Sequence, residues 1–144
     1  MAYLNKKASY EYHFLENYTA GIQLLGSEIK SIRAGKVNIT DGFCFFKDEE
    51  LFLHNVNIEQ YKYSSYLNHE PKRPRKLLLK KRELKRLLEK SNEKGLAIIP
   101  VKLFINETGL AKIEITLAKG KKLYDKRQQI QDRDMNRDLE RQYN

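Results

Sequence analysis

The sequence has little of several features that define common protein classes. Among 144 residues it has one cysteine, Cys44, three histidines and no tryptophan. A single cysteine excludes an internal disulfide, and with only three scattered histidines beside it a zinc site is not expected. No run of 18 apolar residues occurs, and residues 1–14 lack the apolar segment of a signal peptide. These absences predict a cytoplasmic protein with no membrane span, no metal and no cofactor.

Motifs of the common hydrolases and nucleotide-binding enzymes are also missing. The sequence contains no GxSxG element, no Walker loop and no HExxH pair. His13 and His54 fall within strand-like patterns, which favours structural roles for them. Glu28 and Asp41 have no carboxylate at a spacing that would form a catalytic pair, although a fold can bring distant carboxylates together. We interpret the chain as a binding protein and not an enzyme.

Positive charge is what the sequence has in excess. Lys and Arg number 28 against 19 Asp and Glu, a net charge of +9, while 40% of the residues are hydrophobic. This balance favours a folded domain with an anionic partner, nucleic acid ahead of membrane. Between Lys72 and Lys90 only Glu83 and Glu89 oppose ten basic residues. A solvated helix face is the plain alternative, but the imbalance exceeds that of alternating ion pairs and favours phosphate binding.

Apolar and aromatic residues are patterned as in a mainly β protein with two helices. Alternation and turn signals predict six strands, at residues 10–18, 20–26, 37–46, 50–58, 97–105 and 110–118. A short helix is expected between Ser27 as N-cap and Gly35, and a longer one over 81–95 with Gly95 as its stop. A small closed barrel of the oligonucleotide-binding type, with about six antiparallel strands and these two helices, satisfies the pattern without exposed sheet edges.

The nine tyrosines and six phenylalanines allow two interpretations. Tyrosines 61 to 66 surround Lys62 in a loop, where aromatic rings can stack on bases. The phenylalanines of the strand patterns are instead expected in the core: Phe43, Phe45, Phe46 and Phe52.

The C-terminal segment does not belong to the barrel pattern. Residues 1–119 contain all the predicted elements, whereas residues 120–144 have Ile130, Met135 and Leu139 as their main apolar side chains. So few apolar residues predict a basic tail that is disordered alone and forms a helix against a partner.

Four separated motifs carry a resemblance to a known family. They are NKKA (5–8), AGIQLLGSEIKSIRAGKVNI (20–39), RKLLL (75–79) and LAKGKKLYDKR (117–127). In this order they resemble small protein B, the SsrA-binding protein family of bacterial trans-translation. The resemblance implies binding of the tRNA-like domain of transfer-messenger RNA and its delivery, with elongation factor Tu and GTP, to the A site of stalled ribosomes. It further implies a monomer whose tail occupies the decoding centre and the empty mRNA channel, so that the nascent chain is tagged for proteolysis.

The resemblance also assigns residues. Those expected at the RNA are Asn5, Lys6, Lys7, Lys30, Arg33, Lys36, Arg75, Lys76 and Leu78. Those expected in the ribosome-binding tail are Gly120, Lys121, Lys122, Tyr124, Asp125, Lys126 and Arg127. Thr19 stands where the family commonly has an acidic residue, and Pro74 where a polar or basic one is usual. A general tRNA-binding or RNA chaperone barrel would share the charge and the fold but not the tail motif. A nuclease is the enzyme alternative, which a metal-dependent hydrolysis assay tests.

Overall fold

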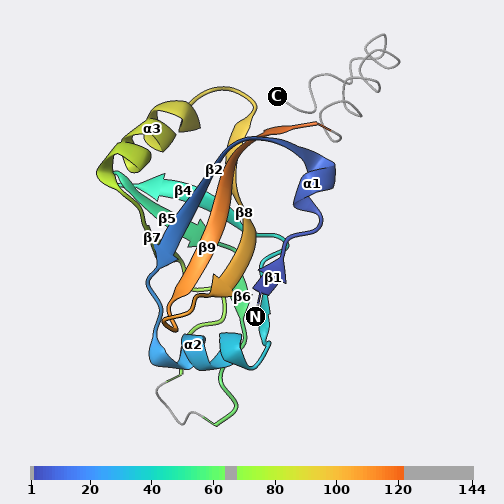
Figure 1. Cartoon of the computed structure of the whole chain (residues 1–144), viewed down its shortest axis with the longest axis vertical. Coiled ribbons are helices and arrows are strands. Elements are labelled where there is room, and N and C mark those ends of the chain that lie inside the picture. The colour runs from blue at the N-terminus through green and yellow to red at the C-terminus, as the bar shows by residue number, and fades with distance from the viewer. Residues whose placement is uncertain (1, 64–67, 122–144) are drawn as a thin grey trace.

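A computed structural model describes residues 2–63 and 68–121 of the chain. The elements are β1 (Ala2–Leu4), α1 (Ala8–Glu11), β2 (Tyr12–Ile22), α2 (Gly26–Arg33), β3 (Val37–Asn38), β4 (Phe43–Lys47), β5 (Glu50–His54), β6 (Asn57–Ile58), β7 (Arg75–Leu78), α3 (Lys81–Ser91), β8 (Leu96–Ile105) and β9 (Ala111–Gly120). Figure 1 shows α2 across one end of the barrel and α3 near the other, with α1 and β1 on the side away from β7.

Six antiparallel strands close into a ring. The sheet order is β1-β8-β4-β5-β7-β2-β9, and β8 also pairs with β9, so the strands from β8 to β9 form the ring while β1 adds to β8 from outside. Closure removes exposed strand edges, which stabilises a small antiparallel sheet against edge-to-edge association. The predicted closed barrel of about six antiparallel strands is confirmed.

Two members of the ring differ from the prediction. Within residues 10–26, expected as two strands, the structure has the single strand β2 from Tyr12 to Ile22, which pairs with β9 and bulges between Phe14 and Glu16. Ala20 and Gly21 do not interrupt it, because they pair in register with Ile113 and Lys112. The sixth strand is β7, which the sequence suggested only as an extended lead-in; Pro74 precedes it and so removes no hydrogen bond from the ladder.

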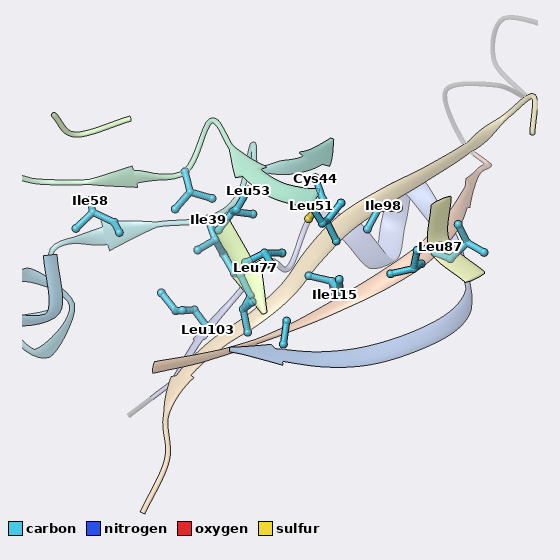
Figure 2. Close-up of a cluster of buried hydrophobic side chains, with 14 of the residues drawn as sticks. Ile39, Cys44, Leu51, Leu53, Ile58, Leu77, Leu87, Ile98, Leu103 and Ile115 are labelled. Atoms are coloured by element: carbon cyan, nitrogen blue, oxygen red, sulfur yellow. The ribbon is translucent and has the colours of Figure 1, made fainter. Parts of the chain in front are cut away.

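The core lies inside the ring, and burial alternates along the first half of β9. Ala111, Ile113 and Ile115 are buried and the residues between them half-buried, as the predicted period of two requires, whereas every residue from Ile115 to Ala118 is buried. Figure 2 shows Ile115 among side chains of β5, β7 and β8, with Leu87 of α3 at one end. Each such buried aliphatic side chain contributes about 1.5–3 kcal/mol of burial free energy. The barrel is therefore filled by its own side chains.

Turns and helix ends place the elements with small differences from the prediction. The expected β4–β5 and β8–β9 hairpins are confirmed. Asp48 and Glu49 both adopt positive φ in the first hairpin, as a two-residue turn between twisted strands requires. α2 begins at Gly26, so Ser27 lies in its first turn and is not the N-cap. α3 ends at Ser91, and Gly95 with φ +84° serves the turn before β8 instead.

The expectation that these four phenylalanines lie in the core is wrong for three of them. Phe52 alternates on β5 with the buried Leu51 and Leu53 and pairs in register with Phe45, so it faces outward. Phe43 and Phe45 are 43% and 63% exposed, because on β4 they alternate with Cys44 and Phe46, which face inward. The ring of Phe43 stacks on that of His54, with centroids 5.4 Å apart.

Candidate nucleic-acid interface

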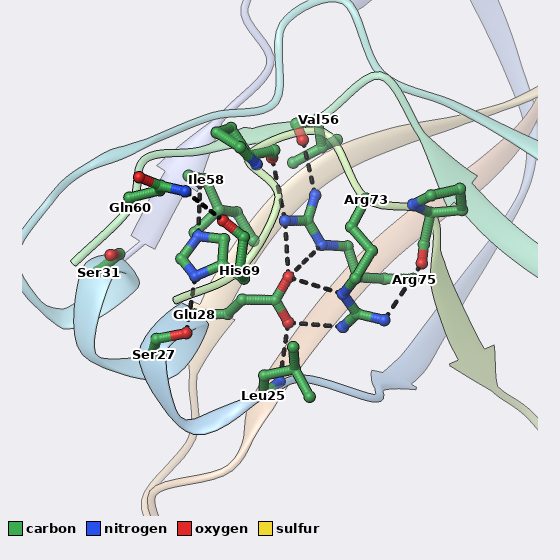
Figure 3. A network of polar contacts seen from close by, with 12 residues as sticks. Leu25, Ser27, Glu28, Ser31, Val56, Ile58, Gln60, His69, Arg73 and Arg75 are labelled. Carbon is green, nitrogen blue, oxygen red and sulfur yellow. Dashed lines mark hydrogen bonds and ion pairs between the residues drawn. The ribbon is translucent and has the colours of Figure 1, made fainter. Parts of the chain in front are cut away.

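A buried ionic cluster fixes α2 against the barrel. The Glu28 carboxylate, in the first turn of α2, is fully buried and accepts hydrogen bonds from Arg75 Nε at 2.8 Å and from Arg73 at 2.6 Å. It also accepts from the backbone N–H of Leu25 at 2.7 Å, which caps the helix (Figure 3). One carboxylate therefore joins the start of α2 to β7 and to the loop before it.

This cluster changes the role expected of Arg75. Its side chain is fully buried and also donates to the carbonyl oxygens of Val56 at 2.7 Å and Pro71 at 3.0 Å. With its guanidinium committed to these partners, Arg75 has no donor facing solvent for a phosphate. Burial raises the pKa of Glu28, but the hydrogen bonds from Arg73, Leu25 and Arg75 outweigh burial and leave this pKa below its ordinary value. Both groups are thus charged and structural at neutral pH.

A histidine holds the same helix from the other side. His69 is 2% exposed, and its Nε2 lies 2.7 Å from the carbonyl oxygen of Ile58. Because a carbonyl can only accept, Nε2 carries the proton and the hydroxyl of Ser27 donates to Nδ1 over 2.8 Å. The loop that leads to β7 is thereby tied to α2, a role that no local sequence pattern indicates.

Leu78 lies in the middle of an exposed surface on β7, β2 and β9. Its side chain is 47% exposed, and Leu78 pairs in register with Gly21, which in turn pairs with Lys112. A Cβ on Gly21 would come within 3.4 Å of Leu78 Cβ and 3.7 Å of Lys112 Nζ. With Thr19 and Lys80 these residues line a hollow of about 550 Å³. We call Thr19, Gly21, Leu78, Lys80 and Lys112 the Leu78 face.

The helix α2 brings the basic side chain of Arg33 beside the Leu78 face. A second hollow, of about 360 Å³, is lined by Leu78 and Lys112 together with Ile29 of α2 and Gly109 of the β8–β9 hairpin. From the same helix Arg33 is exposed and reaches the Gly109 carbonyl oxygen at 3.4 Å.

Three further expected RNA residues lie on or near these elements. Lys30 is exposed with its Nζ 5.6 Å from the centroid of the Tyr61 ring, and Lys36 is exposed just after α2. Lys76, two residues before Leu78 on the outer side of β7, forms an ion pair with Glu50 at 2.6 Å. Of the expected RNA residues on or just after α2, the structure thus places Arg33 beside the hollow that Leu78 lines. Lys30 lies at the Tyr61 ring instead, and Lys76 is partly neutralised.

The N-terminal residues lie elsewhere. Asn5 is only 7% exposed; its amide donates to the Pro100 carbonyl at 2.9 Å and its Oδ1 accepts from the Ala8 N–H at 3.2 Å. Asn5 follows β1, which adds to β8 from outside, and β8 is three strands away from β7 in either direction around the ring. The adjacent Lys6 and Lys7 are exposed. Asn5 therefore holds its turn and offers no amide to a ligand, and the structure does not bring this group onto the Leu78 face.

The basic run from residue 72 to 90 is not one phosphate-binding face. Half of its ten cationic side chains pair with carboxylates of the same chain: Arg73, Arg75, Lys76, Arg86 and Lys90. The others are exposed on the loop before β7 and on and before α3: Lys72, Lys80, Lys81, Arg82 and Lys85. The excess charge that reaches solvent is smaller than the sequence suggested.

Sequence reasoning missed Lys112, and it counted Lys80 only as one of the ten basic residues between Lys72 and Lys90. The alternation of β9 indicated that Lys112 lies on its wet face, but not that this face meets Leu78. Thr19 also pairs in register with Glu114, so a carboxylate of the neighbouring strand lies beside the position where an acidic residue was expected.

The tail residues are only partly within the described chain. Gly120 ends β9, and the Lys121 N–H donates to the Glu11 carbonyl at 2.8 Å. The other tail residues assigned from the sequence lie outside the described residues: Lys122, Tyr124, Asp125, Lys126 and Arg127. Of the tyrosine loop, Tyr61 and Tyr63 pack edge to face with centroids 5.6 Å apart, and Tyr66 lies outside the described residues.

A closed antiparallel barrel with a basic outer surface defines a class of nucleic-acid-binding proteins. In the described ranges, no helix is long and apolar enough to cross a membrane, and acidic, His and Cys side chains form no group of three that could hold a metal ion. A family model described as "SmpB protein" matches residues 2–144. The chain belongs to the SmpB family, a family of RNA-binding proteins and not of enzymes.

Relatives of known name support this membership. The chain is 54% identical to the SsrA-binding protein of Christiangramia forsetii, with 95% of this chain and 87% of the relative covered. It is 56% identical to that of Flavobacterium psychrophilum, with 96% and 92% covered. A solved structure described as "tmRNA-SmpB: a journey to the center of the bacterial ribosome" contains a chain 50% identical to this one, with a TM-score of 0.71 and 84% and 85% of the two chains covered.

Proposed function

We propose that the chain binds the tRNA-like domain of transfer-messenger RNA and delivers it to the A site of stalled ribosomes for trans-translation. Its relatives are SsrA-binding proteins, and the description of the similar solved structure names tmRNA, SmpB and the ribosome. In the structure the proposal depends on one observation, the exposed Leu78 held between Gly21 and two lysines.

The Leu78 face has the chemistry to receive folded RNA. Leu78 offers an apolar contact for a base or ribose, and Gly21, which has no side chain, lets the ligand approach the sheet. Lys80 and Lys112 bring positive charge to the same hollow. Lys30, Arg33 and Lys36 extend the charge along α2, where they contact phosphates. Asn5 and Arg75 hold the elements around them in place and do not bind the RNA directly, since their polar atoms are hydrogen-bonded within the protein.

The remaining parts of the proposal concern the ribosome. Residues 1–119 form the RNA-binding barrel, and residues 120–144 form a tail, disordered alone, that becomes helical in the decoding centre and empty mRNA channel. The delivery complex contains elongation factor Tu with GTP, and the chain acts as a monomer in the bacterial cytoplasm. Truncation after Gly120 is expected to leave RNA affinity nearly unchanged and to abolish tagging. Equal loss of both activities would contradict the division into barrel and tail.

A salt-series titration of the full chain against the tRNA-like domain, with elongator tRNA as competitor, tests the RNA partner. We expect a preference of tenfold or more for the tRNA-like domain, which corresponds to about 1.4 kcal/mol. K112Q should lower the slope of log affinity against log salt by about 0.7–0.9, the loss of one phosphate contact, whereas the exposed control K94Q should not. Equal affinity for both RNAs would instead indicate a general RNA-binding barrel.

A further inference from the structure

An apolar groove lies between β4 on one side and α3 and β8 on the other. Its volume is about 630 Å³, and its walls include Phe45 and Phe46 of β4, Leu88 of α3 and Leu96 of β8. Within the described residues β4 and β8 pair at the single register Cys44–Ile98, which Figure 2 shows side by side, so the two strands diverge beyond this point. None of the residues that line this groove belongs to the Leu78 face.

The wall of the groove includes two phenylalanine rings that are exposed to solvent. Phe43 and Phe45 line it and are 43% and 63% exposed. Two large exposed rings beside a concave apolar surface are typical of a site that another segment covers.

The charge at one end of the groove restricts its occupant. Asp48 and Glu49, at the tip of the β4–β5 hairpin, are part of its lining. Carboxylates repel an RNA backbone, so the aromatic rings are poorly placed as a base-stacking platform. They attract a segment that carries both apolar and basic side chains.

We propose that, while no ribosome is bound, residues 122–127 of the same chain, KLYDKR, dock in this groove, which narrows the disorder proposed for the free tail to the residues beyond Arg127. The segment has two adjacent large apolar side chains, Leu123 and Tyr124, among three basic residues and a single acidic one. This composition complements an apolar groove with an acidic end. Other parts of the chain from residue 128 onward have no two such apolar residues side by side.

The segment also begins next to the groove. Leu96, which lines the groove, pairs in register with Lys119 on β9, and the segment starts three residues later, after Lys121, whose N–H donates to the Glu11 carbonyl. An extended chain advances about 3.3 Å per residue, so Tyr124 can lie up to about 17 Å from Lys119. A tether this short gives an effective concentration on the order of millimolar, so weak contacts suffice for docking. The docking does not depend on the proposed RNA partner.

A thiol on the exposed lining of the groove can report on its cover. Cys44 faces the core, is 7% exposed and has a thiol pKa raised by burial, so it reacts only when the barrel opens. The double variant N92C/C44A instead puts the thiol at an exposed residue of the groove lining, and its rate of modification by N-ethylmaleimide in the full chain measures how often the groove is uncovered. If the segment covers it about nine-tenths of the time, L123S/Y124S should raise the rate about tenfold. The control double variant M135S/L139S, farther along the tail, should leave the rate unchanged.

A second measurement uses the absence of tryptophan. In the full chain Y124W introduces a single indole, whose emission should be blue-shifted and protected from acrylamide. F45S in the Y124W chain should remove both effects, because Phe45 is an exposed wall of the groove, whereas L110S, at an equally exposed residue outside it, should preserve them.

Equal modification rates of N92C/C44A with and without L123S/Y124S, together with an indole that acrylamide quenches as strongly as it does in urea, would overturn the proposal. A blue shift that appears only as protein concentration rises would also overturn it, since the occupant would then be a second copy. Loss of tRNA-like-domain preference in the RNA titration leaves both readouts unaffected, so failure of the proposed function and failure of the docking are distinguishable.

Discussion

Replacing Glu28 with glutamine changes a single side-chain heavy atom, yet it should be among the most destabilising substitutions in the barrel. E28Q keeps one side-chain oxygen to cap the Leu25 N–H but removes the charge that compensates the buried Arg75. Breaking a buried ion pair from one side costs about 3–5 kcal/mol, because an uncompensated charge stays in the core. E28A should cost about 1 kcal/mol more, since it also removes the helix cap. Urea unfolding followed by circular dichroism at pH 7 measures both.

Three further variants serve as controls for E28Q. The exposed E107Q should change the free energy of unfolding by less than about 0.5 kcal/mol. R75M should cost less than E28Q, because Glu28 keeps Arg73, and the double variant should cost clearly less than the sum of the two. Additive losses, or an E28Q chain within about 1 kcal/mol of wild type, would refute the view that this pair is a buried, mutually compensating unit.

Acid titration of the E28Q variant tests the direction of the pKa shift. The folded pKa of Glu28 is below its unfolded value, so its stabilisation is present above the unfolded pKa and is lost as pH falls through the folded one. E28Q should therefore flatten the acid limb of the stability curve. An unchanged acid limb would mean that the hydrogen bonds do not outweigh burial.

Three further outcomes are expected. G42A should lower the free energy of unfolding in urea by about 1–3 kcal/mol, because the new Cβ would lie 2.7 Å from one side chain and 2.9 Å from another. G26A, whose new Cβ would have no atom within 4 Å, should be nearly neutral in the same measurement. Hydrogen bonding to an arginine lowers the pKa of Glu16 to about 2, so the wild type should lose this stabilisation as pH falls from about 4.5 to about 2. E16Q should lose less stability over the same range, which an acid titration followed by circular dichroism measures. N5A should cost about 1–3 kcal/mol in unfolding and leave the RNA affinity of the folded chain unchanged, whereas a direct contact would lower that affinity.

Elements with a regular local pattern could be predicted from the sequence. In β9 four apolar residues alternate with polar ones, and the turn from Asn106 to Gly109 marks the hairpin with β8. The closed barrel followed from the number of such strands and the need to cover their edges. Leu78 was placed at the RNA through family resemblance, since an exposed leucine in a basic run has no local signature.

The rest depended on contacts between residues distant in the sequence. Arg75 and Glu28 are separated by 47 positions, so nothing local distinguishes this arginine from the exposed cations around it. In the run FCFF both faces of β4 are apolar, which hides the alternation that would have shown Phe43 and Phe45 to be outside. Lys112 can be assigned to the Leu78 face only from the strand order, which brings β9 beside β2 and β2 beside β7.

The ion pair at Arg75 also selects one register for β7. Along this four-residue strand Arg75 and Leu77 face the interior, and Lys76 and Leu78 face outward. A slip by one residue would reverse every side chain: Lys76 would enter the core, and Leu78 would leave the outer surface. Such a slip would separate Glu28 from its guanidinium, so the interior charge excludes the misaligned barrel. A residue that no ligand touches thereby determines which side chains the outer surface displays.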